Sequence, residues 1–330
     1  MTLSIGFLGF GEVGSSFARG LRDEHADVRL LAYDAAPPGS DAARLVASRA
    51  EEGGVRLVGS PGEIAQECES VLSAVPSSFA VDAARSVREH LRPGHGFYDL
   101  TAAHPSTKAH VAELVGHVAV ADLAIVGPVR VLAHRVPILA SGRFAAGQLE
   151  TLRGLGMDID VVSEEVGDAS AIKLCRSVFT KGIEALLVET LMAAESLGVS
   201  ETVLTSIEKT LASQRFPEAA NRYVTGNAIH AGRRVHEVED VIALLEAQGV
   251  EPLATRGTLE RMRRSASSGA REHFGGVPPE HYGAVVSYYA HHESRTDPAR
   301  QETRKHREDR ERNSTEPDRT TTETKESRRA

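Results

Sequence analysis

The sequence is poor in several residue types, and each scarcity narrows the classes of protein that it can encode. It has no Trp and two Cys, Cys68 and Cys175, in 330 residues; two thiols cannot build a disulfide framework or a Cys-based zinc site. No run of 18 or more apolar residues is present, so we expect no membrane-spanning helix. The net charge of −8 disfavours nucleic acid as the main partner. Residues 1–9 lack a basic start and a cleavage site, so we expect no signal peptide and a cytoplasmic location.

Lysine is also scarce. Six of the 38 basic residues are Lys and the other 32 are Arg. The lysines that precede residue 291 are Lys108, Lys173, Lys181 and Lys209. Arginine stays protonated, whereas a lysine amine can lose its proton at accessible cost. A retained lysine in this chain is therefore informative about proton chemistry.

The pattern of apolar residues divides the chain into three parts. Residues 1–163 alternate short apolar runs with helical patterns, which predicts βαβ units and a mostly parallel, doubly wound α/β sheet. Residues 167 to about 266 show helical periodicity and no convincing strand, which predicts an all-α domain at 164–290. Residues 291–330 hold 11 Lys+Arg and 10 Asp+Glu with almost no large apolar side chain, so we expect a disordered charged tail.

The expected elements are as follows. Strands are predicted at 3–9, 28–33, 55–58, 71–75, 96–100, 118–123 and 136–140, with helices among them at 12–21, 81–90 and 106–114. Helices of the second domain are predicted at 168–197, 200–212, 217–223, 226–248 and 252–265.

A glycine motif follows the first predicted strand and opens the first helix. It is a G-x-G-x-x-G made of Gly9, Phe10, Gly11, Glu12, Val13 and Gly14. The three glycines of such a motif serve a tight turn, close approach of a pyrophosphate and close helix–strand packing. Asp34 ends the second predicted strand, 20 residues after Gly14, where a carboxylate can bind both ribose hydroxyls. We therefore expect a Rossmann domain that binds NAD. Arg44 could reach a 2′-phosphate, so binding of NADP stays open.

The loop after the fourth predicted strand lies at the carboxyl edge of the expected sheet, where open α/β folds bind ligands. We expect Val75, Pro76 and Ser77 to contact the cofactor. The small hydroxylated residues of this loop either face a ribose or cap the next helix, and the sequence leaves both interpretations open.

A polar stripe runs along the otherwise apolar helix predicted at 168–197. Lys173, Ser177 and Lys181 are spaced by four and share one face, with Glu184 at its edge. The stripe either faces a wet cleft, where Lys173 can act as an acid–base group, or faces solvent and pairs with Glu184.

The order of these motifs resembles the β-hydroxyacid dehydrogenase family, which includes 6-phosphogluconate and 3-hydroxyisobutyrate dehydrogenases. The family has an N-terminal fingerprint, an Asp-x-Ser/Thr segment, matched by residues 99–101, and a helix with one lysine. The helical half is similar to a poorly characterised phosphogluconate-dehydrogenase-like branch, through segments 171–177, 181–182 and 230–237. The resemblance implies a Rossmann domain, a helical domain and a homodimer.

The resemblance also implies roles for individual residues. Lys173 stands at the position of the family's general acid–base, and Thr101, with Ala102 beside it, at a substrate-contacting loop. Gly127 matches the family's substrate-binding segment, and Ser177 replaces its substrate-holding Asn. We expect Lys181 to bind an anionic group of the substrate or to support Lys173 electrostatically.

Three departures from the family pattern bear on the substrate. Arg176 replaces the His of the phosphogluconate enzymes, Ser177 replaces Asn, and Val126 replaces the Ser that usually binds a substrate carboxylate. We therefore expect neither phosphogluconate nor the simplest 3-hydroxy acid.

The sequence thus predicts an NAD(P)-dependent dehydrogenase acting on a CH–OH group of a small anionic substrate, with decarboxylation a further step open to it. The alternatives are an imine reductase on the same scaffold, against which Lys173 argues, and a non-catalytic dinucleotide-binding protein. His104 and His134 are isolated in sequence and are interpreted as structural or solvated, and no metal site is expected.

Overall fold

The computed structural model describes residues 3–296, with side chains as far as residue 292. Residues 297–330 of the tail predicted at 291–330 lie outside the described residues. The chain divides into two compact units, Met1–Thr180 and Lys181–Ala330. The sequence predicts a boundary after residue 163. The contacts instead divide the chain inside helix α8 (Asp168–Ser196), which starts in the first unit and ends in the second.

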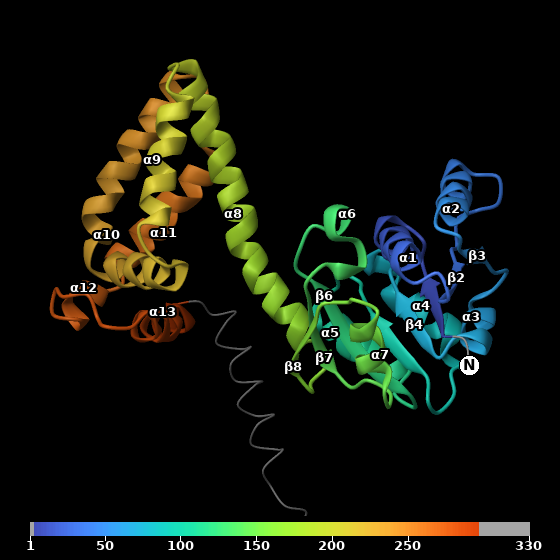
Figure 1. Ribbon diagram of the computed structural model, residues 1–330. Coiled ribbons are helices and arrows are strands. Elements are labelled where there is room, and N and C mark those ends of the chain that lie inside the picture. The colour runs from blue at the N-terminus through green and yellow to red at the C-terminus, as the bar shows by residue number, and fades with distance from the viewer. Residues whose placement is uncertain (1–2, 297–330) are drawn as a thin grey trace, which may run out of the picture. The chain divides into compact units, whose positions relative to one another are not determined.

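An eight-stranded sheet forms the centre of the first unit (Figure 1). The strands are β1 (Ser4–Leu8), β2 (Arg29–Tyr33), β3 (Arg56–Leu57), β4 (Ser70–Ser73), β5 (Gly96–Asp99), β6 (Ala119–Ile125), β7 (Ile138–Gly142) and β8 (Ile159–Ser163). They lie in the order β3-β2-β1-β4-β5-β6-β7-β8, with β6 and β7 the antiparallel pair. The predicted mostly parallel sheet is confirmed. Strand β8 was not predicted, because only Ile159 is fully buried in this edge strand and no apolar run marks it.

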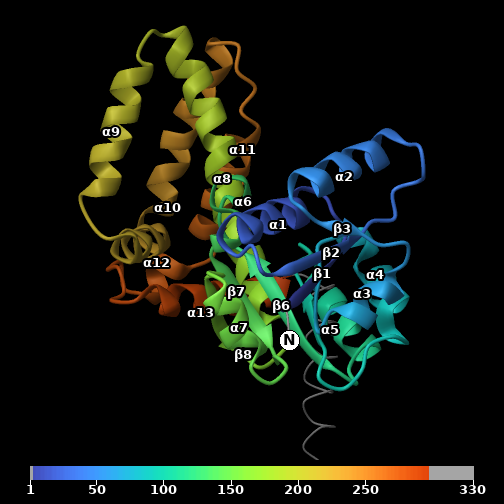
Figure 2. The ribbon, with the colours of Figure 1, turned by 45° about the vertical axis from the view of Figure 1, so that its right-hand side comes forward.

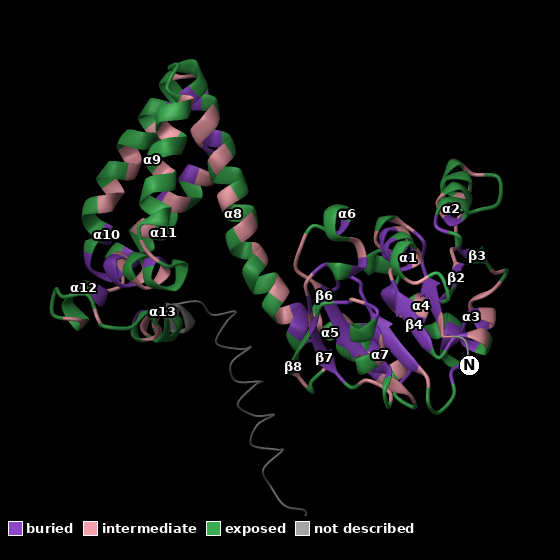
Figure 3. Ribbon diagram, viewed as in Figure 1, coloured by how far each residue is buried: buried purple, intermediate pink, exposed green. Residues whose placement is uncertain are grey.

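Helices cover both faces of this sheet. They are α1 (Glu12–Glu24), α2 (Asp41–Glu52), α3 (Pro61–Glu67), α4 (Ala80–Arg88), α5 (Pro105–Leu114), α6 (Val129–Leu132) and α7 (Gln148–Gly154), with 3-10 turns η1 (Ser77–Phe79) and η2 (Ala133–Arg135). Val71 and Phe97 pack into the core under α3, α4 and α5, whereas Leu72 and Tyr98 pack into the core under α1 and α7. Since neighbours along a strand point to opposite faces, both faces are buried and the strands are almost continuously apolar (Figure 3).

The topology places the site at one edge of the sheet. Strands β1, β2, β4, β5 and β6 run parallel, so their carboxyl ends share an edge. The chain turns outward from β1 in two directions, to β2 on one side and to β4 on the other. Ligands of open α/β sheets bind at such a point, outside the carboxyl ends of the strands.

The second unit is helical, as predicted. It contains the second half of α8, then α9 (Ser200–Ala212), α10 (Phe216–Ala247), α11 (Leu253–Ser267), α12 (Ala270–His273) and α13 (Tyr282–Thr296) (Figure 2). The sequence predicts two helices within 217–248, but α10 continues without a break through Gly226. Burial of Ala228 and Ile229 beside that glycine holds the helix together against the modest propensity cost of Gly. Helix α13 also extends to Thr296, past residue 291 where the tail was expected to begin.

A buried carboxylate joins two helices of the second unit. Glu189 of α8 accepts hydrogen bonds from the backbone amides of Ala254 and Thr255, the latter at 3.1 Å, and from the Thr255 hydroxyl at 2.7 Å. It therefore caps the start of α11 from a different helix. Burial opposes its ionisation, but the Thr255 hydroxyl and the backbone amides outweigh that cost and lower the pKa of Glu189.

Replacing Glu189 with Ala is expected to destabilise the protein by about 1–3 kcal/mol, because it leaves buried backbone amides without a hydrogen-bond acceptor. Because the pKa of Glu189 is lowered in the folded protein, its contribution to the free energy of unfolding should be complete above the ordinary carboxyl pKa. That contribution should be lost as the pH falls through the lowered pKa. Denaturant unfolding at several pH values measures both effects. Glu237→Ala, which removes an exposed pair with Arg233, is the control and should cost much less. Equal losses for the two variants would contradict the capping role.

Among the described residues, no helix is both long enough and apolar enough to cross a bilayer.

Candidate active site

The glycine turn after β1 has the geometry that a dinucleotide requires. Gly9 has a φ of +82°, a left-handed conformation that favours glycine, and its amide donates to the Tyr33 carbonyl at 2.8 Å. A Cβ built on Gly14 would lie 2.7 Å from the Gly9 carbonyl oxygen, so Gly14 permits α1 to pack tightly on the turn. A Cβ on Gly11 would meet no atom within 4 Å, so that position opens onto free space. The tight turn, the open space and the close helix packing thus fall to Gly9, Gly11 and Gly14 respectively, as the fingerprint predicts.

The N-terminus of α1 faces this open space without a side-chain cap. Gly11 is the N-cap residue and offers no hydrogen-bonding side chain. The first amides of a helix lack intrahelical partners and carry the positive end of its dipole, so they attract phosphate. Glu12, in the first turn, forms an ion pair with Arg130, which follows β6. That ion pair is neutral overall, and it places a guanidinium near the start of α1.

Substituting alanine at two of these glycines separates folding from cofactor binding. Gly14→Ala should destabilise the fold by about 1–3 kcal/mol, because its methyl group collides with a backbone oxygen. Gly11→Ala should fold normally and bind NAD(P)H more weakly, because its backbone φ of −73° suits alanine and the methyl enters the open space. Thermal unfolding and calorimetric titration measure the two effects. Normal cofactor affinity in Gly11→Ala would contradict this placement of the pyrophosphate.

Asp34 has a structural task that the sequence did not reveal. One of its carboxylate oxygens accepts from the Phe10 amide at 2.7 Å, and the other accepts from the Ala36 amide at 2.9 Å. The carboxylate thus ties the end of β2 to the fingerprint turn. Each oxygen keeps a further lone pair for a ribose hydroxyl. Arg44, the candidate phosphate reader, instead pairs with Asp41 and donates to the Gly39 carbonyl at 2.7 Å.

The loop after β4 lies against the glycine turn. A Cβ on Gly9 would come within 2.8 Å of the Val75 side chain, so Val75 closes one side of the turn. Pro76 and Ser77 are exposed at the start of η1. Neither η1 nor α4 has a side-chain cap, so the interpretation of these serines as helix caps is not supported.

A buried charged cluster lies at the ends of β5 and β6. The Lys108 ammonium is fully buried and sits 3.1 Å from a carboxylate oxygen of Asp99 and 3.1 Å from one of Asp122. It also donates to the Asp99 carbonyl at 2.9 Å. Asp122 in turn accepts from the Ser170 amide at 2.8 Å and the Ser170 hydroxyl at 2.9 Å. Two strands and α5 thereby hold the first turn of α8 in place.

Lys173 lies on α8, one turn after Ser170, and is partly buried. Burial lowers the pKa of its ammonium, the charge of Lys108 lowers it further, and Asp122 raises it in part. The net direction is downward. The two charges that act on Lys173 belong to the buried cluster, so the cluster holds the start of this helix and also contributes, after burial, to the basicity of its lysine.

Thr101 contributes a free polar group to the same region. Its amide donates to Asp99 at 2.9 Å, and its side chain is buried. Within the part of the chain that is described, the Thr101 hydroxyl oxygen has no hydrogen-bond partner. Buried hydroxyls are normally paired, so an unpaired one beside a charged cluster is a candidate ligand contact. Ala102 follows it and is exposed.

The other predicted residues are less closely tied to this cluster. The Ser177 hydroxyl donates to the Lys173 carbonyl at 2.9 Å, one turn back on α8. Lys181 begins the second unit, is exposed, and pairs with Glu184 at 2.8 Å, as the solvent-facing interpretation of the stripe predicts. Gly127 packs against Val136 and Pro137, which leave no room for a Cβ.

Sequence reasoning missed Lys108 and the task of Asp122. The available signal was weak: Lys108 is one of four lysines in the folded part, and both Asp99 and Asp122 belong to otherwise apolar strands. A charged residue in a buried strand requires a partner. Nothing in the sequence said which of the many arginines and lysines supplies it.

Comparison with known proteins agrees with this architecture. Residues 4–143 match the NAD-binding domain of 6-phosphogluconate dehydrogenase, and residues 194–265 match a domain of unknown function, DUF1932. A conserved hypothetical protein from Sinorhizobium meliloti 1021 is 33% identical, with 88% of this chain and 97% of that chain covered and a TM-score of 0.53.

Two further solved structures are informative. A conserved protein of unknown function, described as structurally similar to 3-hydroxyacid dehydrogenases, is 33% identical, with 82% of this chain and 98% of that chain covered and a TM-score of 0.53. An imine reductase from Pseudomonas sp. is 18% identical, with 87% and 99% covered and a TM-score of 0.69, and shares the fold. The chain therefore belongs to the 6-phosphogluconate dehydrogenase-like family, with an NAD(P)-binding domain and a C-terminal domain of the DUF1932 type.

Proposed function

We propose that this protein is an NAD(P)-dependent oxidoreductase that interconverts a hydroxyl and a carbonyl group, with Lys173 carrying the proton. The observation that carries the proposal is the partly buried Lys173 of lowered pKa, one turn after Ser170, which the buried cluster holds, together with the unpaired Thr101 hydroxyl beside that cluster. A lysine whose ammonium is disfavoured is suited to general acid–base catalysis.

The residues around the glycine turn fit the cofactor. The space at Gly11, the uncapped start of α1 and Arg130 suit a pyrophosphate, and Asp34 lies where a ribose is expected. Bound NAD(P) supplies the acceptor or donor of the hydride. We propose NAD as the preferred form, because the Asp34 carboxylate would repel a 2′-phosphate.

The proton moves through the chain's own residues. In the oxidation, Nζ of neutral Lys173 accepts the hydroxyl proton of the substrate while the C–H bond of the same carbon gives up its hydride. The C–O bond becomes a carbonyl, and Lys173 becomes an ammonium. In the reduction, the ammonium returns that proton. The Thr101 hydroxyl, which has no hydrogen-bond partner within the described residues, is the proposed second donor to the same substrate oxygen.

The substrate is proposed to be a small molecule with an anionic group. Ala102, Gly127, Ser177 and Lys181 are the remaining candidates to contact it. Val126 stands where the resembling family has a carboxylate-binding serine, so the simplest 3-hydroxy acid is not the proposed substrate. If the substrate is a 3-hydroxy acid, its 3-keto product can lose CO2 in a following step.

A homodimer and a cytoplasmic location are part of the proposal. Helix α8 exposes large apolar side chains, with Val178 78%, Val188 55% and Met192 53% exposed. Such a surface needs covering, and a second copy of the chain is the partner that the family resemblance implies. Light scattering of the purified protein gives the mass directly.

The test is a panel of hydroxy acids, their keto acids and cyclic imines, assayed with both NAD(H) and NADP(H). Turnover of a hydroxy acid or keto acid supports the proposal. Turnover of imines alone selects the imine reductase, whose fold the chain shares. Cofactor binding with no turnover across the panel selects a non-catalytic dinucleotide-binding protein.

A further inference from the structure

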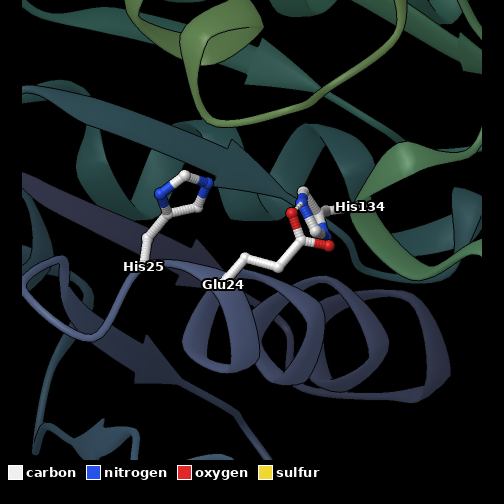
Figure 4. Close-up of side chains that lie close together, drawn as sticks. All are labelled: Glu24, His25 and His134. Carbon is white, nitrogen blue, oxygen red and sulfur yellow. Dashed lines mark ion pairs between the residues drawn. The ribbon is translucent and has the colours of Figure 1, made fainter.

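Three side chains that can bind a metal converge at the end of α1. Glu24 is the last residue of α1, His25 is its C-cap, and His134 belongs to η2. One ligand atom from each lies within 4.8 Å of the others. Figure 4 shows the Glu24 carboxylate and the His134 ring side by side, with the His25 ring extending from the same end of α1. The three belong to the first unit, so their arrangement does not depend on the second.

His134 is buried in an unusual way for a histidine. Its side chain is 1% exposed, and within the described part of the chain neither ring nitrogen has a hydrogen bond of good geometry. The Leu155 carbonyl, which lies 3.2 Å from Nε2 of His25, is the backbone group that the His134 ring approaches. Its Nε2 lies 3.8 Å from a Glu24 oxygen, too far for a hydrogen bond. A buried imidazole whose two nitrogens have no better contact than one shared carbonyl calls for an explanation, and a bound ion is one of the few available.

The backbone around His134 is built to bring the ring inward. A Cβ on Gly20 would lie 2.4 Å from Nδ1 of His134, so the absence of a side chain on α1 makes room for the ring. Ala133, the preceding residue, has a φ of +49°, the one positive φ at a non-glycine residue in the described range. Such a conformation persists only where its surroundings enforce it.

We propose that Glu24, His25 and His134 form a binding site for a divalent transition metal of the zinc class. Two imidazoles and one carboxylate suit Zn²⁺, whereas Mg²⁺ and Ca²⁺ prefer oxygen ligands alone. Tetrahedral zinc with bonds of about 2.0–2.1 Å needs its ligand atoms about 3.4 Å apart, so the three ligand atoms, which lie within 4.8 Å of one another, must draw closer when the metal binds. The fourth position falls to water.

Arg135 occupies the Glu24 carboxylate and should therefore oppose metal binding. Its guanidinium binds both oxygens of Glu24, at 2.8 Å for the Nε–Oε1 pair, and its side chain is 58% exposed. This cation neutralises the Glu24 carboxylate in the metal-free protein and competes with a metal for it. Removal of Arg135 should therefore strengthen metal binding, whereas removal of His134 should weaken it.

The site is structural in location. Glu24 lies 12 residues along α1 from Glu12, which is about 18 Å at 1.5 Å per residue. The metal would tie the end of α1 to η2 at a distance from the glycine turn. Zinc should therefore raise the unfolding temperature and leave the affinity for NAD(P)H unchanged.

The test is calorimetric titration of the full-length, metal-stripped protein with Zn²⁺, repeated with Co²⁺ to record the visible absorption of four-coordinate cobalt. We expect one high-affinity site per chain, at least tenfold weaker in His134→Gln and in Glu24→Gln, and tighter in Arg135→Gln. His110→Gln, which removes an exposed histidine paired with Glu113, is the matched control and should bind as wild type.

Glu24→Gln keeps the result interpretable if His134→Gln fails to fold, because Glu24 is partly exposed. The absence of a stoichiometric site in wild type would overturn the proposal. Equal affinity in wild type, His134→Gln and Glu24→Gln would also overturn it, since the metal would then be bound elsewhere.

Discussion

Replacing Lys173 with Ala is expected to lower kcat by about 10²–10⁴-fold, the usual contribution of a general acid–base catalyst. The dissociation constant for NAD(P)H should stay close to that of wild type, because the proposed cofactor contacts come from the glycine turn and Asp34. Steady-state kinetics on the first substrate found, together with calorimetric titration of the cofactor, measure the two quantities separately.

The matched control for this variant is Lys209→Ala. Lys209 is an exposed lysine of α9, so the substitution removes the same side chain and the same charge from a different part of the surface. Its kcat should equal that of wild type. Wild-type turnover in Lys173→Ala, or loss of both turnover and cofactor binding, would contradict the role of Lys173.

Replacing Lys108 with Met is expected to destabilise the protein by about 3–5 kcal/mol, because it leaves two carboxylates buried without their cation. It should also change the pH dependence of the enzyme. The charge of Lys108 helps to lower the pKa of Lys173, so its removal should raise that pKa. Oxidation needs neutral Lys173, and its rate rises with pH through this pKa. The rising limb of the pH–rate profile should therefore move to higher pH.

Asp122→Asn should move the rising limb of the pH–rate profile to lower pH. Asp122 partly offsets the lowering of the Lys173 pKa, so its removal should lower the pKa further and move the limb to lower pH. The two variants disturb the same buried cluster but are predicted to have opposite effects on the profile. If Lys108 and Asp122 had only a structural role, both variants would be less active and the rising limb of the pH–rate profile would stay at the wild-type pH. Shifts of the limb in the same direction in both variants would contradict the electrostatic role of the two residues.

The fold was largely predictable because its signals are local. The order of apolar runs and helical stretches gave the Rossmann domain and the helical domain, and Gly9, Gly11 and Gly14 have the conformations and spaces that their spacing implies. Strand β8 and the unbroken α10 were missed, because each depends on contacts with the rest of its unit rather than on its own pattern.

The candidate site was predictable only in part. Lys173 stood out through its rarity, its helix and a family resemblance. The charges that shift the pKa of Lys173 are far from it in sequence: Asp122 comes from β6 and Lys108 from α5. The proposed metal ligands likewise join residues 24 and 134, which no spacing rule connects. Asp34 was predicted from the motif as a ribose contact, but its hydrogen bond to the Phe10 amide, which gives it a structural role as well, was not predicted.

The most direct test of the account is to follow the hydride itself. Cofactor deuterated at C4 of the nicotinamide, prepared separately on each face, would be incubated with the protein and a panel of keto acids and cyclic imines, and the products would be analysed by mass spectrometry. The account predicts deuterium on the carbinol carbon of a hydroxy acid, from one face only, in wild type and almost none in Lys173→Ala. Deuterium in amine products alone, or equal transfer by the two proteins, would contradict it.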